Sequence, residues 1–130
     1  LTHKIMFKKL LAVTGLMLIL PLGTFAASEP MKCKVVSQKD YEPMRFQVVL
    51  NEAQGSVTHT QENDLTYDVS ATYTPTTVSW RKVHAILPGV EIANSYQLDR
   101  TTLKVTSESK AVMGEDEEPA IGTLYVGSCR

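Results

Sequence analysis

Alternation of apolar and polar residues is the feature that most restricts the fold of this 130-residue chain. Between Leu65 and Tyr73, apolar residues at odd positions alternate with polar residues at even positions. A period of two is typical of a strand with one buried and one solvated face. Shorter runs follow the same rule at Phe46–Leu50, with Val49 as an exception, and at Tyr96–Leu98 and Leu103–Val105, and no stretch has a convincing helical period. The pattern predicts an all-β fold.

Turn signals separate these runs at intervals of mostly a dozen or so residues. They are Tyr41-Glu42-Pro43, Gln54-Gly55-Ser56, Glu62-Asn63-Asp64, Pro75, Pro88-Gly89 and Gly114 to Pro119. This spacing predicts an antiparallel meander of seven or eight strands, arranged as a small closed or partly open barrel. A β-sandwich is the alternative, and a barrel is preferred because closure removes exposed strand edges.

The segment around the single tryptophan predicts an irregular strand. Val78 and Trp80 share one face, whereas the apolar residues between Val83 and Leu87 have the opposite parity. A β-bulge at Arg81-Lys82 would move the apolar side back toward the core. In that arrangement His84 faces water or makes a local hydrogen bond.

The N-terminus predicts an export signal over residues 1–26. Basic residues precede an apolar run at Leu10–Leu22, and small residues follow at Gly23–Ala27, which is typical of a secretory signal peptide. Cleavage after Ala26 would leave a single all-β domain, 27–130, without membrane attachment. The 13 basic residues include three in this segment, so the domain has ten basic against 14 acidic residues, a net charge of −4. We expect a periplasmic or secreted protein.

Two cysteines lie near the two ends of that domain, Cys33 and Cys129. An even pair in an exported chain is read as a disulfide by default. The bond would tie the first strand to the last and favour closure of the barrel. Redox activity is disfavoured because the chain has no Cys-x-x-Cys motif.

The second half of the chain carries a motif pattern as well. Thr77-Val78-Ser79-Trp80 is followed by Asp99-Arg100-Thr101-Thr102 and then by Gly127-Ser128-Cys129. This pattern resembles a group of small secreted bacterial proteins without assigned function, which share an Asp/Asn-Arg-x-Thr strand and a terminal Gly-x-Cys. The resemblance implies a small all-β fold with a disulfide, and it implies no activity, substrate or catalytic residue.

Seven residues are candidates for contact with a ligand or partner. Arg100 is placed at the rim of the core, where it would either anchor an anionic group or stabilise a turn through backbone carbonyls. Trp80 and Tyr96 lie on apolar strand faces and either fill the core or line a pocket for a small apolar ligand. Four consecutive acids in a predicted loop could contact a basic protein partner, namely Glu115, Asp116, Glu117 and Glu118.

Several classes of chemistry are disfavoured by the residues present. His59 and His84 are the only histidines after the signal segment, and two imidazoles without visible further ligands predict no metal site. The chain has no Gly-x-Ser-x-Gly elbow, dinucleotide fingerprint or phosphate loop, so no cofactor is expected. The charge balance argues against nucleic-acid binding.

Three hypotheses for function follow, in order of preference. The first is an exported, non-catalytic protein that binds another protein through a strand edge, a loop or the acidic segment, as an inhibitor or interaction module. The second is a carrier of a small apolar ligand in an aromatic-lined barrel. The third is a small hydrolase, which would need a polar constellation that the sequence does not reveal.

Overall fold

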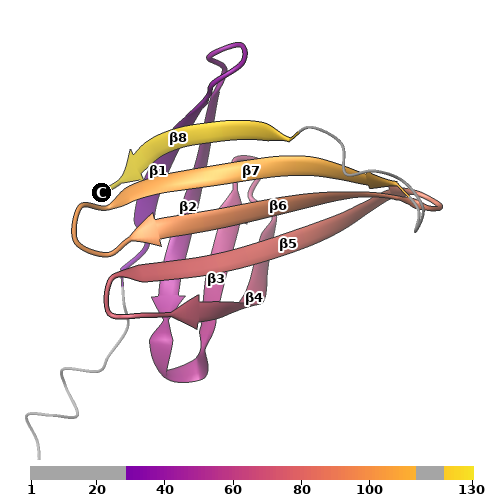
Figure 1. Cartoon of the computed structure of the whole chain (residues 1–130). Coiled ribbons are helices and arrows are strands. Elements are labelled where there is room, and N and C mark those ends of the chain that lie inside the picture. The colour runs from indigo at the N-terminus through magenta and orange to yellow at the C-terminus, as the bar shows by residue number, and fades with distance from the viewer. Residues whose placement is uncertain (1–28, 114–121) are drawn as a thin grey trace, which may run out of the picture.

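The computed structural model describes residues 29–113 and 122–130, and these form a closed eight-stranded antiparallel barrel (Figure 1). Each strand pairs with the next along the chain, and the last pairs with the first. The strands are β1 (Met31–Ser37), β2 (Pro43–Asn51), β3 (Ser56–Gln61), β4 (Thr66–Tyr73), β5 (Thr77–Leu87), β6 (Val90–Asp99), β7 (Lys104–Met113) and β8 (Thr123–Cys129). A 3₁₀ turn, η1 (Glu52–Gln54), follows β2. The all-β prediction and the preference for a barrel over a sandwich are confirmed.

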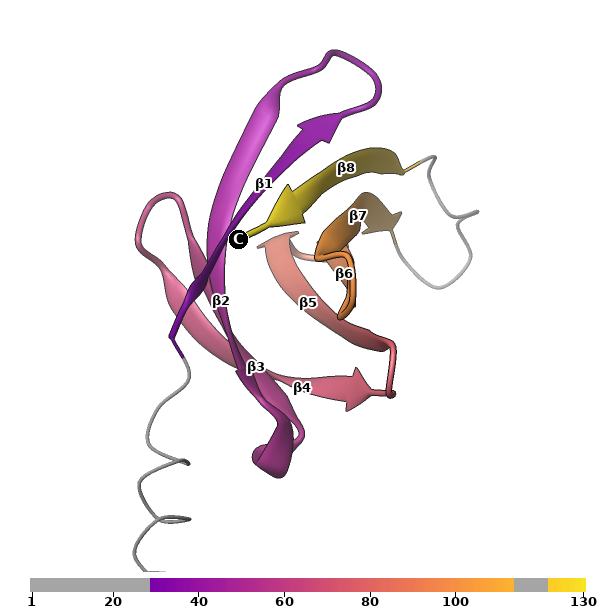
Figure 2. The same ribbon diagram turned by 90° about the vertical axis from the view of Figure 1, so that its left-hand side faces the viewer.

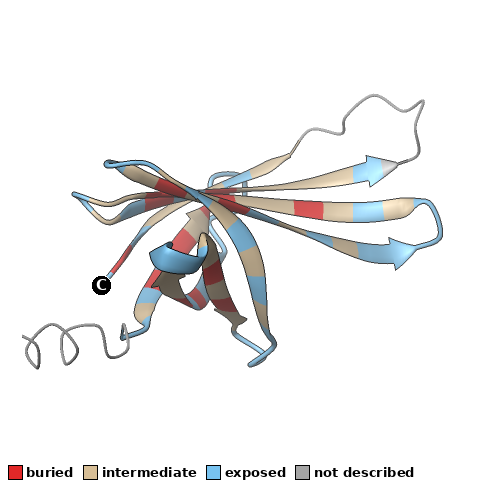
Figure 3. Ribbon diagram, turned by 90° about the horizontal axis from the view of Figure 1, so that it is seen from below, coloured by how far each residue is buried: buried red, intermediate tan, exposed pale blue. Residues whose placement is uncertain are grey.

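The core lies where β1–β4 face β5–β8 across the barrel (Figure 2). Inward residues alternate with exposed ones, and six aliphatic residues are fully buried: Val35, Val48, Val57, Val78, Leu98 and Val105. At one end β5, β6 and β7 extend past β4, and exposed residues gather toward the tips of these long strands (Figure 3). Within the described ranges, no helix has the length and apolar character that crossing a bilayer requires.

The predicted bulge at Arg81-Lys82 is wrong. Pairing between β5 and β6 continues in register through these residues, and the irregularity falls later, between Ala85 and Leu87. Val83 is therefore on the outer face and 37% exposed. The prediction failed because this part of β5 extends beyond the core, where an apolar residue no longer marks the inward side.

The closure between β8 and β1, which we call the tied seam, is continuous and covalent. Five residue pairs run along it, and Cys33 and Cys129 sit opposite each other and form a disulfide. Beyond that bond, Lys32 and Arg130 exchange two backbone hydrogen bonds of 2.9 Å. The two backbones approach closely at Gly127, where an added Cβ would overlap the carbonyl oxygen of Lys34. The predicted disulfide and the predicted pairing of first and last strands are confirmed.

The closure between β4 and β5, which we call the short seam, consists of three residue pairs. Ala71–Tyr73 pair with Val78–Trp80, and beyond Trp80 the two strands pair only with their other neighbours. One backbone edge of β5 from Arg81 to Leu87 therefore has no strand partner among the described residues.

Candidate binding surfaces

Aromatic rings fill the barrel interior around His59, whose residue exposure is 1%. The imidazole stacks on Phe46 at 4.7 Å and on Tyr67 at 5.1 Å between ring centroids. The indole Nε1 of Trp80 donates a 3.1 Å hydrogen bond to His59 Nδ1, and the Trp80 ring stacks on Tyr96 at 5.3 Å. Two of the candidate contact residues, Trp80 and Tyr96, are thus parts of the core.

The interior groups are not poised for proton transfer near neutral pH. Burial, followed by the nearby charge of His84, lowers the pKa of His59 to about 4. Because an indole N–H can only donate, His59 accepts at Nδ1 and carries its proton on Nε2. Burial also raises the pKa of the Tyr96 hydroxyl. A general acid or base works best with a pKa near the working pH, which neither group has.

Three buried polar atoms lack partners among the described residues, one on each of β4, β5 and β7. Tyr67 Oη, His84 Nε2 and Ser107 Oγ are buried and have no hydrogen-bond partner in the described part of the chain. The Lys82 ammonium lies 5.0 Å from the Tyr67 ring centroid. His84 packs edge-on against Tyr67 at 6.0 Å, so the expectation that it faces water or is locally bonded is wrong. Its inward position follows from the missing bulge.

Arg100 links three turns at one end of the barrel. It lies just after β6, and its guanidinium contacts the Glu52 carboxylate at 2.6 and 3.3 Å. The same group donates a 2.8 Å hydrogen bond to the Thr74 carbonyl and lies 5.6 Å from the Tyr73 ring centroid. The hydrogen bonds between Arg100 and Glu52 lower the pKa of Glu52 and raise the pKa of Arg100. This geometry matches the turn-stabilising role considered for Arg100, with an added carboxylate partner.

The rest of the Asp-Arg-x-Thr motif also serves this turn. Asp99 Oδ1 accepts hydrogen bonds from the backbone N–H groups of Thr101 at 2.8 Å and Thr102 at 2.9 Å. These bonds lower the pKa of Asp99. An aspartate that bonds backbone groups two and three residues ahead is a common way to start a turn.

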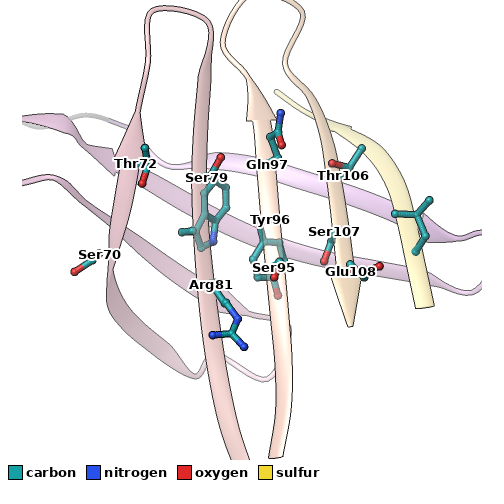
Figure 4. Close-up of a pocket in the computed structure, with 12 residues that line it drawn as sticks. Ser70, Thr72, Ser79, Arg81, Ser95, Tyr96, Gln97, Thr106, Ser107 and Glu108 are labelled. Atoms are coloured by element: carbon teal, nitrogen blue, oxygen red, sulfur yellow. The ribbon is translucent and has the colours of Figure 1, made fainter. Parts of the chain in front are cut away.

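A shallow groove of about 430 Å³ crosses the outer face of β4–β8 (Figure 4). Hydroxyl and amide side chains dominate its rim: Ser70, Thr72, Ser79, Ser95, Gln97 and Thr106. Arg81 and Glu108 add one charge of each sign. Trp80 and Tyr96 form part of its floor, but they are 3% and 5% exposed because their rings fill the interior.

The hairpin between β5 and β6 presents an apolar surface at its tip. A second groove, of about 660 Å³, is bounded by residues 85–89, Glu91 and Val112. Leu87 is 62% exposed and Ile86 53%, values that are high for large aliphatic side chains. From the sequence, Val83–Leu87 is only an apolar run, and such a run predicts core residues rather than an exposed surface.

A third groove, of about 420 Å³, lies over the disulfide on the outer face of β1 and β2. Four basic residues line it, and a fifth stands on the neighbouring β7: Lys32, Lys34, Arg45, Arg130 and Lys104. We call these five residues the basic face. Sequence reasoning missed it, although the bases that flank both cysteines, in Lys-Cys-Lys and Ser-Cys-Arg, were a usable signal.

The four predicted acidic contacts, Glu115 to Glu118, lie outside the described residues. Across the described ranges, no three His, Cys, Asp or Glu side chains are grouped so that they could hold a metal ion. Comparison of the chain with protein-family models, with curated proteins and with solved structures gives no match. Proposals about function therefore rest on the geometry of these surfaces.

Proposed function

We propose that the protein is an exported, non-catalytic binding protein that takes an extended segment of another protein onto the free edge of β5. The observation that carries this proposal is the unpaired edge from Arg81 to Leu87, next to a seam of only three residue pairs. The disulfide suits an oxidising compartment, such as the periplasm or the cell exterior.

An unpaired edge is a template for one more strand. In an antiparallel sheet, alternate backbone N–H and C=O groups of an edge strand point away from its single partner. Natural edges are normally short, covered or charged, whereas this edge ends in Val83-His84-Ala85-Ile86-Leu87. A partner strand would satisfy these groups and cover the exposed side chains of Val83 and Leu87.

The two other hypotheses have less geometric support. A carrier of apolar ligands needs interior space, and the rings of His59, Trp80 and Tyr96 occupy the barrel centre. A hydrolase needs a nucleophile and base within hydrogen-bond reach, and His59 is neutral and hydrogen-bonded to an indole. Both remain hypotheses and rank below strand binding.

Display of random extended peptides on phage tests the proposal directly. We expect the immobilised protein to enrich peptides that alternate apolar and polar residues, because such a peptide can pair with β5 and cover its apolar side chains. Hydrogen exchange should then show slower exchange at amides of residues 81–87 when a selected peptide is bound.

A matched pair of variants distinguishes binding at the β5 edge from nonspecific binding to the protein surface. Val83→Lys with Leu87→Lys places two charges at the edge and should weaken a selected peptide at least tenfold. Tyr41→Lys with Leu65→Lys adds the same two charges at side chains that are 73% and 51% exposed in other turns, and should leave the affinity unchanged. Failure to enrich any peptide, or equal binding to both variants, would exclude the edge as the binding site.

A further inference from the structure

The basic face places cations on β2, β1 and β7 and directly after the end of β8. Lys34 of β1 lies opposite Arg45 of β2 on one side and opposite Ser128 of β8 on the other. Ser128 lies opposite Lys104 of β7. Because neighbouring strands are about 4.8 Å apart, this row spans about 14 Å across the strands. Lys32 and Arg130 pair with each other beside the row, on the same outer face.

Two carboxylates, Glu62 and Asp64, line the same groove, but neither forms an ion pair with a residue of the basic face. Ion pairs in the described ranges join Arg100 to Glu52 and Lys110 to Glu108, and none involves the five residues of this face. Like charges placed directly opposite across an antiparallel pair destabilise a sheet. The arrangement of Lys34 against Arg45 therefore costs stability, which a bound anion would recover.

The strands under these cations are covalently cross-linked. The Cys33–Cys129 disulfide fixes β1 to β8 directly beneath the face. At one end of the row, Glu62 Oε1 accepts a 2.9 Å hydrogen bond from the backbone N–H of Arg45. That carboxylate holds the β2 backbone and limits the cationic surface on the β3 side.

We propose that the basic face binds a linear polyanion that carries phosphate or sulfate groups at regular intervals. A guanidinium fork and several ammonium groups suit tetrahedral oxyanions, and a row of cations suits a chain with repeated charges. A chain fits better than a flat bilayer because the surface is grooved. Large exposed apolar side chains of the described residues lie elsewhere, at positions 41, 65, 83, 86, 87, 112 and 124.

Fluorescence anisotropy with labelled inorganic polyphosphate and labelled dextran sulfate tests this site. We expect Lys34→Gln with Arg45→Gln to weaken binding at least tenfold at about 50 mM salt, and to make the slope of log affinity against log salt shallower by about one to two. The matched control is Lys39→Gln with Lys110→Gln, which changes the net charge equally, lies outside both the basic face and the β5 edge, and should shift affinity less than twofold. Melting curves verify that both variants are folded.

Two probes define the class of ligand. Comparison of polyphosphate with dextran sulfate identifies which oxyanion is preferred, and binding of either supports the site. Equal binding of polyglutamate, or of phosphatidylglycerol vesicles, would overturn the assignment to an oxyanion chain. So would equal weakening by the two double variants, which would indicate attraction to net charge alone. None of these results depends on the β5 edge, which the same variants leave intact.

Discussion

The two seams that close the barrel are built in opposite ways. The tied seam has five residue pairs, a disulfide and an additional backbone exchange between Lys32 and Arg130. The short seam has three residue pairs and no covalent link. Closure of a barrel therefore does not require equal pairing around its circumference, and a weakly paired seam leaves a strand edge that a partner can use.

Side chains, more than backbone pairs, bridge the short seam. The hydrogen bond from Trp80 to His59 joins β5 to β3 across β4, and Tyr67 of β4 stacks on the same imidazole. Arg100 reaches the turn between β4 and β5 from outside. The stability of the tied seam should consequently depend on its backbone pairing and its disulfide. The stability of the short seam should depend on pH and on substitutions of single side chains.

The largest effect is expected from removal of the disulfide. The bond closes a loop with a sequence separation of 96, so the chain-entropy model predicts a loss of about 4–5 kcal/mol in Cys33→Ala with Cys129→Ala. Urea unfolding, followed by the fluorescence of the single Trp80, measures it. A loss below about 1 kcal/mol would mean that backbone pairing alone holds the tied seam.

Gly127→Ala should break the same seam without touching the disulfide. The new Cβ would overlap backbone atoms of Lys34 and Val35, which cannot move without separating β8 from β1. We expect a loss of about 3 kcal/mol or more in the free energy of unfolding. Gly122→Ala is the control because its Cβ would meet only side-chain atoms of Lys110 and Glu108. Equal losses in the two variants would contradict this account of the seam.

Acid should weaken the short seam through His59. Its pKa is about 4 when folded against 6.5 when unfolded, so between these values the unfolded chain binds a proton that the folded chain does not. Stability is therefore full above pH 6.5 and falls by up to about 3 kcal/mol as the pH drops to 4. Urea unfolding at several pH values in wild type and His59→Phe isolates this contribution, because the variant lacks the titrating group. Identical slopes would show that His59 is not the group involved.

Much of the fold could be predicted from local pattern, and the binding surfaces could not. Alternation in Leu65–Tyr73, the turn signals and the two cysteines predicted an all-β meander with a terminal disulfide, and they favoured a closed or partly open barrel over the alternative of a sandwich. Alternation does not indicate over how many residues two neighbouring strands pair, so the short pairing between β4 and β5 could not be predicted. The same limit explains the mistaken bulge, since the apolar residues after Lys82 face outward on a projecting strand.

The basic face was missed for a different reason. Counting charge over the whole domain gives a negative value, which hides a local array. The registers of β7, β8, β1 and β2 bring together residues as far apart in sequence as Lys32 and Arg130. Only the bases that flank Cys33 and Cys129 could have been grouped from sequence, given the expected disulfide.

The smallest effect is expected from Arg100, and it separates the two roles considered for this residue. The ion pair with Glu52 is accessible to solvent, with the Arg100 side chain 28% and the Glu52 side chain 56% exposed, so Arg100→Ala should lower the melting temperature by only about 5 °C or less. Arg100→Lys keeps the charge but loses the fork that holds both Glu52 and Thr74, and should recover only part of that loss. If Arg100 only stabilises turns, affinity for a peptide selected on the β5 edge and for polyphosphate stays unchanged in both variants. A selective loss of either affinity in a stably folded variant would instead make Arg100 a contact residue and extend the binding region to the end of the short seam.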